Sequence, residues 1–124
     1  MKTYRVVELL GDGISAELSH SVHTLARSLP CRLEFVPVDL SDENRRQRGF
    51  ALYEEAAAKM KEHKVSLKYP TATTTDSPNK VLRDLCDFAV IHRPVATIPG
   101  IENNFKKTID VDVVRIATGG TRSE

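Results

Sequence analysis

Cysteine is scarce in this chain, and its two copies form no recognisable motif. Cys31 and Cys86 lie far apart, and neither belongs to a Cys-x-x-Cys pair. Disulfide-stabilised domains and structural zinc sites both need several cysteines at short, regular spacings. The sequence therefore indicates neither kind of site, and we expect the protein to work in a reducing cytoplasm.

An excess of one charge is missing too, as are long apolar runs. Eighteen basic residues stand against seventeen acidic ones, so the formal net charge is +1. This balance gives no field that would attract nucleic acid or an anionic membrane, and we expect neither as a partner. The N-terminal segment has no long apolar stretch, so we expect no signal peptide and no membrane helix.

Apolar segments with strand and helix periodicity do alternate along the chain. Residues 4–10 and 33–38 have the pattern of buried strands, and between them Ile14 begins a helical stripe. The stripe consists of Ile14, Leu18, Val22, Leu25 and Leu29. Further strands are expected over 65–68, 88–92 and 111–117, further helices over 50–64 and from Ser77, and an exposed loop over 39–49.

This order of elements predicts an α/β fold with an open, mostly parallel sheet flanked by helices. The length of 124 residues is typical of one domain, so we expect a single domain over residues 1–124. Ligands of such sheets bind at the carboxyl ends of the strands. The side chains that follow the strands are therefore the first candidates for function.

Three arginines are the most informative polar residues. Ser77 followed by Pro78 is typical of a helix start. In this helix, Asn79 and Arg83 are four residues apart and therefore share one face. Arg93 and Arg115 each follow an apolar run, at the expected ends of strands. Guanidinium groups match carboxylates with two parallel hydrogen bonds. If the three converge, they suit a small ligand with several carboxylates.

Each of these features also has a structural interpretation. Ser77 can act as a helix cap alone, and a single arginine is more often a surface residue than a ligand-binding one. The run from Gly11 to Gly13 can be a tight turn between a strand and a helix. His20 and His23, three residues apart, fit an exposed pair better than a metal site, and exposure is the default for Lys68.

The combined spacing resembles the β-decarboxylating dehydrogenases, the isocitrate and isopropylmalate dehydrogenase family. The family has Gly-Asp-Gly-Ile after its first strand, as at residues 11–14 here, and later Ser-x-Asn-x-x-x-Arg, Arg-Pro and a strand-ending arginine. The resemblance implies that the chain matches the N-terminal part of these enzymes. It also assigns substrate-carboxylate binding to Ser77, Asn79, Arg83, Arg93 and Arg115.

The resemblance extends to a cofactor region. Lys68, Pro70 and Thr71 resemble the family's Lys-Gly-Pro-x-Thr stretch, with Tyr69 in place of the glycine. The resemblance implies that Ile14, Lys68 and Thr71 border NAD or NADP. The segment Thr118-Gly119-Gly120 is closer to the isopropylmalate enzymes.

Two departures bear on catalysis. Ile116 stands where the family has Glu, and Arg122 stands where it has a tyrosine that takes part in proton transfer. The family's catalytic lysine and its Mg²⁺- or Mn²⁺-binding aspartates belong to a later part of those longer enzymes. We therefore assign no catalytic or metal-binding residue here, and we expect the chain alone to use no cofactor.

Two functions remain open from the sequence. The first is a non-catalytic, truncated isocitrate dehydrogenase-like protein that binds a protein partner or a carboxylate metabolite such as a tricarboxylate, and that forms a homodimer to cover exposed surface. The second is a subunit or fragment of an NAD(P)-dependent dehydrogenase that oxidatively decarboxylates a 2-hydroxy acid.

Overall fold

The computed structural model describes residues 1–104 and 108–117. The chain divides into two compact units, Met1–Cys86 and a second unit that begins at Asp87, and each is described by itself. The expectation of one domain over residues 1–124 stays a prediction, because a division into compact units does not decide whether they fold independently.

The first unit contains a three-stranded parallel sheet in the order β2-β1-β3. Its strands are β1 (Thr3–Leu10), β2 (Arg32–Asp39) and β3 (Ser66–Lys68). Its helices are α1 (Ser15–Ala26), α2 (Asp42–Arg48), α3 (Phe50–His63) and α4 (Pro78–Cys86). Val7 of β1 pairs with Val36 on one side and with Ser66 on the other. The predicted α/β fold with a parallel sheet flanked by helices is confirmed.

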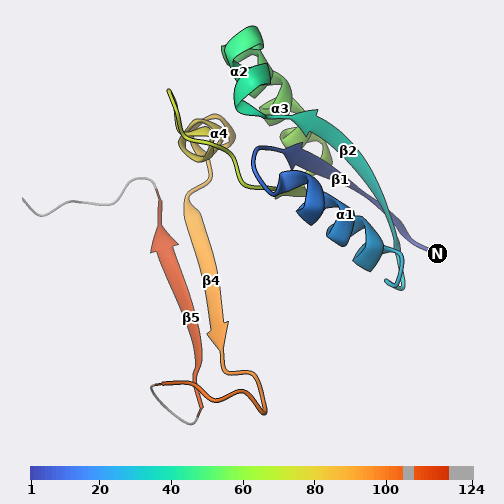
Figure 1. The fold of residues 1–124 in the computed structure, drawn as a ribbon, viewed down its shortest axis with the longest axis vertical. Helices are drawn as coiled ribbons and strands as arrows, with labels where there is room; N and C mark the ends of the chain where they lie inside the picture. The colour runs from blue at the N-terminus through green and yellow to red at the C-terminus, as the bar shows by residue number, and fades with distance from the viewer. Residues whose placement is uncertain (105–107, 118–124) are drawn as a thin grey trace, which may run out of the picture. The chain divides into compact units, whose positions relative to one another are not determined.

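Alternation along β1 determines what each face of the sheet packs against, because successive strand side chains point to opposite faces. Val7 and Leu9 join a core with Leu52 and Met60 of α3 and Leu82 of α4. Between them, Glu8 is buried on the other face, which α1 crosses (Figure 1). The apolar core therefore lies between the sheet and α3 with α4.

The apolar side chains predicted to form a buried stripe on α1 are more exposed to solvent than their helical periodicity suggests. Ile14 is 59% exposed and Leu25 is 67% exposed, whereas Leu18 and Val22 are half-buried. The one fully buried side chain of α1 is Ser15. Helix α1 is therefore held largely by polar contacts to Glu8, and part of its apolar surface faces outward.

The expected loop over residues 39–49 is wrong in its centre, which forms helix α2. Ser41 caps this helix by accepting a hydrogen bond from the Asn44 N–H through its hydroxyl oxygen, and Gly49 ends it with a positive φ of 61°. Acidic residues in the first turn and arginines in the last also fit the helix dipole. The expectation of exposure fails at Arg45, which is 5% exposed.

The second unit contains an antiparallel hairpin of β4 (Val90–Ala96) and β5 (Asp110–Ile116). Strand β4 starts later and runs further than predicted, so Arg93 lies inside it and not at its end. Pro94 is tolerated because a two-stranded ribbon leaves an edge without ladder bonds. In the described parts of both units, no helix is long and apolar enough to cross a membrane.

Candidate functional site

The carboxyl edge of the parallel sheet brings three connecting segments together. The turn after β1 passes very close to the loop after β3, because a Cβ atom added to Gly11 would lie 2.0 Å from the Pro70 carbonyl oxygen. The backbone N–H of Asp12 donates to the same carbonyl at 2.8 Å. Glycine is therefore needed at position 11 for space, and the interpretation of residues 11–13 as a tight turn fits this geometry.

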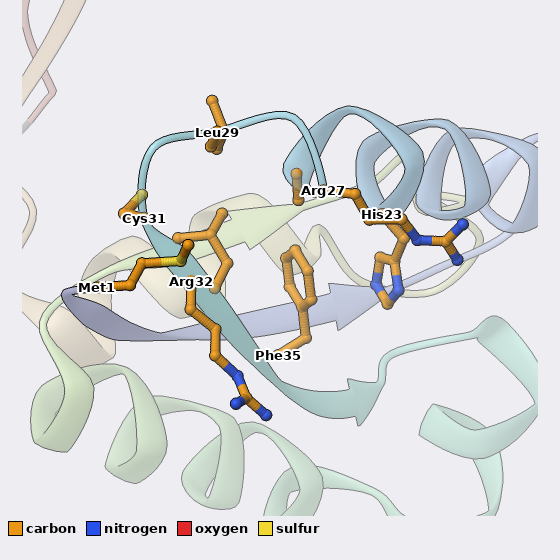
Figure 2. A pocket seen from close by; sticks show the side chains of 9 residues that line it. Met1, His23, Arg27, Leu29, Cys31, Arg32 and Phe35 are labelled. Carbon is orange, nitrogen blue, oxygen red and sulfur yellow. The ribbon is translucent and has the colours of Figure 1, made fainter.

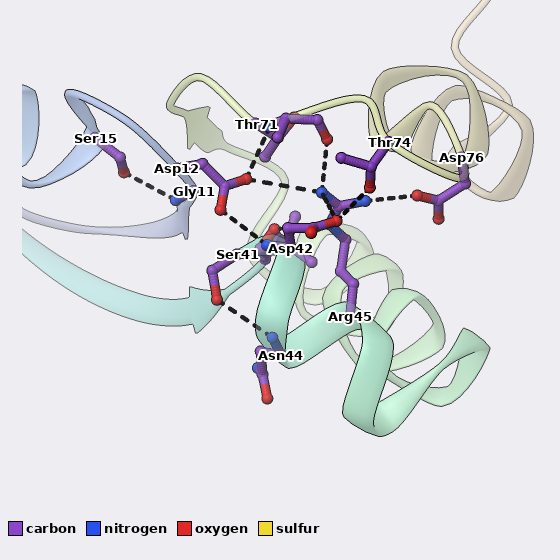
Figure 3. Close-up of polar contacts among 12 residues, drawn as sticks. Gly11, Asp12, Ser15, Ser41, Asp42, Asn44, Arg45, Thr71, Thr74 and Asp76 are labelled. Carbon is purple, nitrogen blue, oxygen red and sulfur yellow. Dashed lines mark hydrogen bonds and ion pairs between the residues drawn. The ribbon is translucent and has the colours of Figure 1, made fainter.

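Asp12 and Arg45 join these segments (Figure 3). One carboxylate oxygen of Asp12 accepts the backbone N–H of Asp42 at 2.9 Å, and the other accepts that of Ala72 at 2.8 Å. The Arg45 guanidinium donates to the Ala72 carbonyl at 2.6 Å and to the Asp76 carboxylate at 2.5 Å. Its Nε donates to the carbonyl of Leu40 at 3.0 Å. Arg45 is thus a buried structural cation.

Other polar side chains surround this arginine. The Tyr53 hydroxyl donates to Asp76 at 2.5 Å, and burial raises the pKa of Tyr53 to about 12. A hydrogen bond from Thr74 and an ion pair with Arg46 lower the pKa of Asp42. These neighbours favour a charged Asp42 and a neutral Tyr53 beside Arg45.

Lys68 and Thr71, two residues of the predicted cofactor region, lie together at this edge. The Lys68 Nζ donates to the Thr71 hydroxyl at 2.8 Å and to the Tyr69 carbonyl at 3.0 Å. Lys68 is half-buried, and its pKa is lowered by burial first and then by the nearby Arg45 charge. Ile14, the third predicted residue, is exposed directly before α1. Contact of these residues with a cofactor stays a prediction.

The predicted substrate residues of the first unit belong to the start and middle of α4. The carbonyl of Ser77 accepts the Val81 N–H at 3.0 Å, so Ser77 immediately precedes the helix, with Pro78 buried at its first position. Asn79 is exposed and Arg83 is half-buried. Arg83 belongs to the first unit, whereas Arg93 and Arg115 belong to the second, so the convergence of all three stays a prediction.

Arg93 and Arg115 share one face of the hairpin. Ile91 is opposite Arg115, and Arg93 is opposite Val113, so all four point to the same side. The two arginines are diagonal neighbours, for which Cα separations of roughly 7–8 Å are usual. Both are exposed, and within residues 1–104 and 108–117 neither has a carboxylate partner. The His92 Nε2 lies 2.8 Å from an Asp112 carboxylate oxygen on the opposite face.

A buried carboxylate that sequence reasoning missed lies under α1. One oxygen of Glu8 accepts hydrogen bonds from the hydroxyls of Ser19 at 2.9 Å and Tyr69 at 2.8 Å, and it lies 2.8 Å from the His23 Nε2. Burial is also the main reason that the pKa of Tyr69 rises to about 12. His23, expected to be exposed, is partly so: its side chain is 42% exposed, and Glu8 and a stacked Phe35 ring cover the rest. The sequence signal that could have identified this site is the position of a charged residue, Glu8, within an otherwise apolar strand.

Some residues singled out from the sequence lie outside the described part of the structure, and the described part holds no cluster of metal-binding side chains. Residues 118–120 and Arg122 lie outside the described residues, and Ile116 is exposed near the end of β5. In the part of the chain that the structure describes, no three His, Cys, Asp or Glu side chains gather as a metal site requires.

Comparisons with known proteins point to one family. No family model matches the chain. A 3-isopropylmalate dehydrogenase of Methanothermobacter thermautotrophicus is 28% identical over 101 residues, which are 82% of this chain and 31% of that enzyme. The crystal structure of a β-decarboxylating dehydrogenase from Thermococcus kodakarensis, in its apo form, matches with a TM-score of 0.60 and 16% identity over 90% of this chain and 41% of its own. The chain thus spans about a third of the curated relative. The chain is therefore similar in sequence to part of a 3-isopropylmalate dehydrogenase, and it shares the fold of part of a β-decarboxylating dehydrogenase.

Proposed function

We propose that this protein binds a small 2-hydroxy acid with several carboxylates and does not catalyse its oxidation alone. The pairing of Arg93 and Arg115 on one hairpin face is the observation that carries the proposal. Their guanidiniums are exposed and free of carboxylate partners among the described residues, so they are available to an anion. The carboxylates of bound isocitrate or 3-isopropylmalate would supply the negative charges that these two arginines lack as partners.

The expected affinity of this pair is modest. A hydrogen bond to a charged group contributes about 1.5–3 kcal/mol when solvent is excluded, and less at an exposed site. Two such contacts correspond to a dissociation constant on the order of millimolar. Ser77, Asn79 and Arg83 of α4 would strengthen binding if they reach the same ligand, as the family resemblance implies.

Titration of the purified chain with isocitrate and with 3-isopropylmalate tests the proposal. Amide chemical shifts of β4 and β5 should move, without added metal, and the melting temperature should rise. The double variant Arg93→Gln with Arg115→Gln should abolish both effects. Arg46→Gln, a matched change at an exposed arginine of α2, should leave them intact. Equal binding by the double variant would sink the proposal.

A second copy of the chain is our proposal for the protein partner. The hairpin exposes apolar side chains on both faces: Val95 and Val111 are each 50% exposed on the arginine-bearing face, and Val90 and Val114 are 56% and 61% exposed on the other. Pairing with another copy would bury this surface. Sedimentation velocity should show a dimer that Val114→Glu disrupts. A monomer at all concentrations of the unaltered chain would contradict the idea.

A dehydrogenase subunit is the second candidate. The hydrogen bond between Lys68 and Thr71 at the carboxyl edge of the sheet favours it, because nucleotides bind at this edge in open α/β sheets. NAD⁺ or NADP⁺ should then shift the resonances of Lys68, Thr71 and Ile14. Reduction of NAD⁺ by isocitrate or 3-isopropylmalate, followed at 340 nm with the chain alone and Mg²⁺, would refute our preference for a non-catalytic protein.

A further inference from the structure

A cavity between the end of α1 and β2 is used by neither proposed function. It has a volume of about 320 Å³, which falls within the range of small-molecule sites. Its lining comes from the last turns of α1, the following connection and the first half of β2. Since β2 begins there, the cavity lies at the amino end of the parallel strands, opposite to the edge that Arg45 organises.

One wall of the cavity is flat, apolar and fixed in place. The His23 and Phe35 rings stack with centroids 4.1 Å apart and planes 11° from parallel (Figure 2). His23 is held from behind by the buried Glu8 carboxylate. Ala26 and Leu29 add aliphatic surface to the same cavity. An apolar ligand segment would therefore meet a surface that is already ordered before binding.

The charged side chains that line the cavity are arginines, and Cys31 adds a thiol. Two arginines, Arg27 and Arg32, line it together with His23, and no carboxylate does. Arg27 has no partner in the part of the chain that is described, and the Arg32 Nε is 3.8 Å from Glu34, which is a long ion pair. In Figure 2, the Arg27 side chain extends past His23, whereas the Arg32 side chain points away from the Phe35 ring, as alternation along β2 requires. This arrangement favours an anion over a neutral or cationic ligand.

We propose that this cavity binds a small apolar carboxylate, with its hydrocarbon part against Phe35 and Leu29 and its carboxylate at Arg27. The ligand class differs from the hydroxy acids assigned to the hairpin, because it has one carboxylate and a longer hydrocarbon part, whereas they have several carboxylates. The two sites also belong to different units of the chain.

Octanoate, octan-1-ol and octylamine are suitable probes, because they share a chain length and differ in the charge of the head group. In two-dimensional amide NMR titrations, octanoate should shift resonances of residues 23–35. Octan-1-ol should bind about tenfold more weakly, which is the effect of losing one charge-assisted contact, and octylamine should not bind. Octylamine binding as tightly as octanoate, or shifts confined to other residues, would overturn the proposal.

Variants separate the charge from the shape of the cavity. Arg27→Gln should reduce octanoate binding to the level of octan-1-ol, whereas Arg5→Gln, an exposed arginine of β1 outside the lining, should have no effect. Ala26→Phe should fill the cavity and weaken both ligands. Unchanged octanoate binding by Arg27→Gln would refute the assignment. Because Arg93→Gln should not affect octanoate, this test fails or succeeds independently of the hydroxy-acid proposal.

Discussion

Replacing Arg45 by methionine should destabilise the first unit far more than the same change at its neighbour Arg46. The Arg45 side chain is 3% exposed, and it donates to two carbonyl oxygens and to the carboxylate of Asp76. Methionine preserves much of the volume and none of the hydrogen bonds. Arg46 is 58% exposed and makes one ion pair, with Asp42.

The magnitude follows from what is left unpaired. Breaking a buried ion pair on one side costs about 3–5 kcal/mol, because the partners stay desolvated. Asp76 is 34% exposed and can regain some water, so the lower half of that range, about 3–4 kcal/mol, is expected for Arg45→Met. An exposed helix pair contributes about 0.3–0.5 kcal/mol, so Arg46→Met should cost no more than this.

Urea unfolding followed by circular dichroism at 222 nm measures both variants. With a urea slope of about 1–2 kcal/mol per molar for a unit of this size, Arg45→Met should lower the midpoint by roughly 1.5–4 M and Arg46→Met by less than about 0.5 M. If Arg45→Met is too unstable to purify, Arg45→Lys, which keeps the charge and loses the planar fork, should give an intermediate midpoint. Equal midpoints for the two methionine variants would refute the view that Arg45 holds the edge.

Two further perturbations address the same edge and the buried carboxylate. Tyr53 and Tyr69 each have a pKa raised to about 12 in the folded chain, so the unfolded chain loses their protons at a lower pH. Their contribution to the free energy of unfolding should be complete below pH 10 and should fall between pH 10 and 12. Urea midpoints and the absorbance of tyrosinate at 295 nm can follow this change, and a flat profile would contradict it. Gly11→Ala should lower the free energy of unfolding in urea by about 2 kcal/mol or more, because the new Cβ would collide with the Pro70 carbonyl. A loss under about 0.5 kcal/mol would show that the two backbone segments can move apart at low cost.

Periodicity was a sufficient guide to most of the elements. The strands at 4–10 and 33–38 and the helix at 50–64 were predicted to within two residues of β1, β2 and α3. Their apolar residues repeat at the strand or helix period, and burial in the core reinforces that local preference. The parallel order of the first three strands follows from the helices between them.

Helix α2 shows where the argument from composition failed. Three arginines in residues 39–49 indicated an exposed loop, yet Ser41 at the cap, acids in the first turn and Gly49 at the end are the ordinary signals of a helix. No local signal could predict the burial of Arg45, because its partners at residues 72 and 76 come from a distant segment. A buried cation depends on tertiary structure that sequence spacing does not contain.

The candidate binding residues were predictable in part. Their spacing predicted Ser77, Asn79 and Arg83 around one helix start, which fits α4. It did not predict that β4 and β5 pair as a hairpin, since an antiparallel ribbon was not distinguished from two strands of a parallel sheet. The common face of Arg93 and Arg115 follows only from the hairpin register.

The boundary at Cys86 has a consequence for synthesis on the ribosome. Every member of the apolar core precedes residue 87, as does each partner of Arg45. The slowest contact to form, the pairing of Val7 with Ser66 across a long connection, is therefore available once α4 leaves the exit tunnel. The hairpin emerges later, and its contacts are local, so it can form within microseconds. A nascent chain that stalls after α4 already carries a complete core, but it lacks both hairpin arginines.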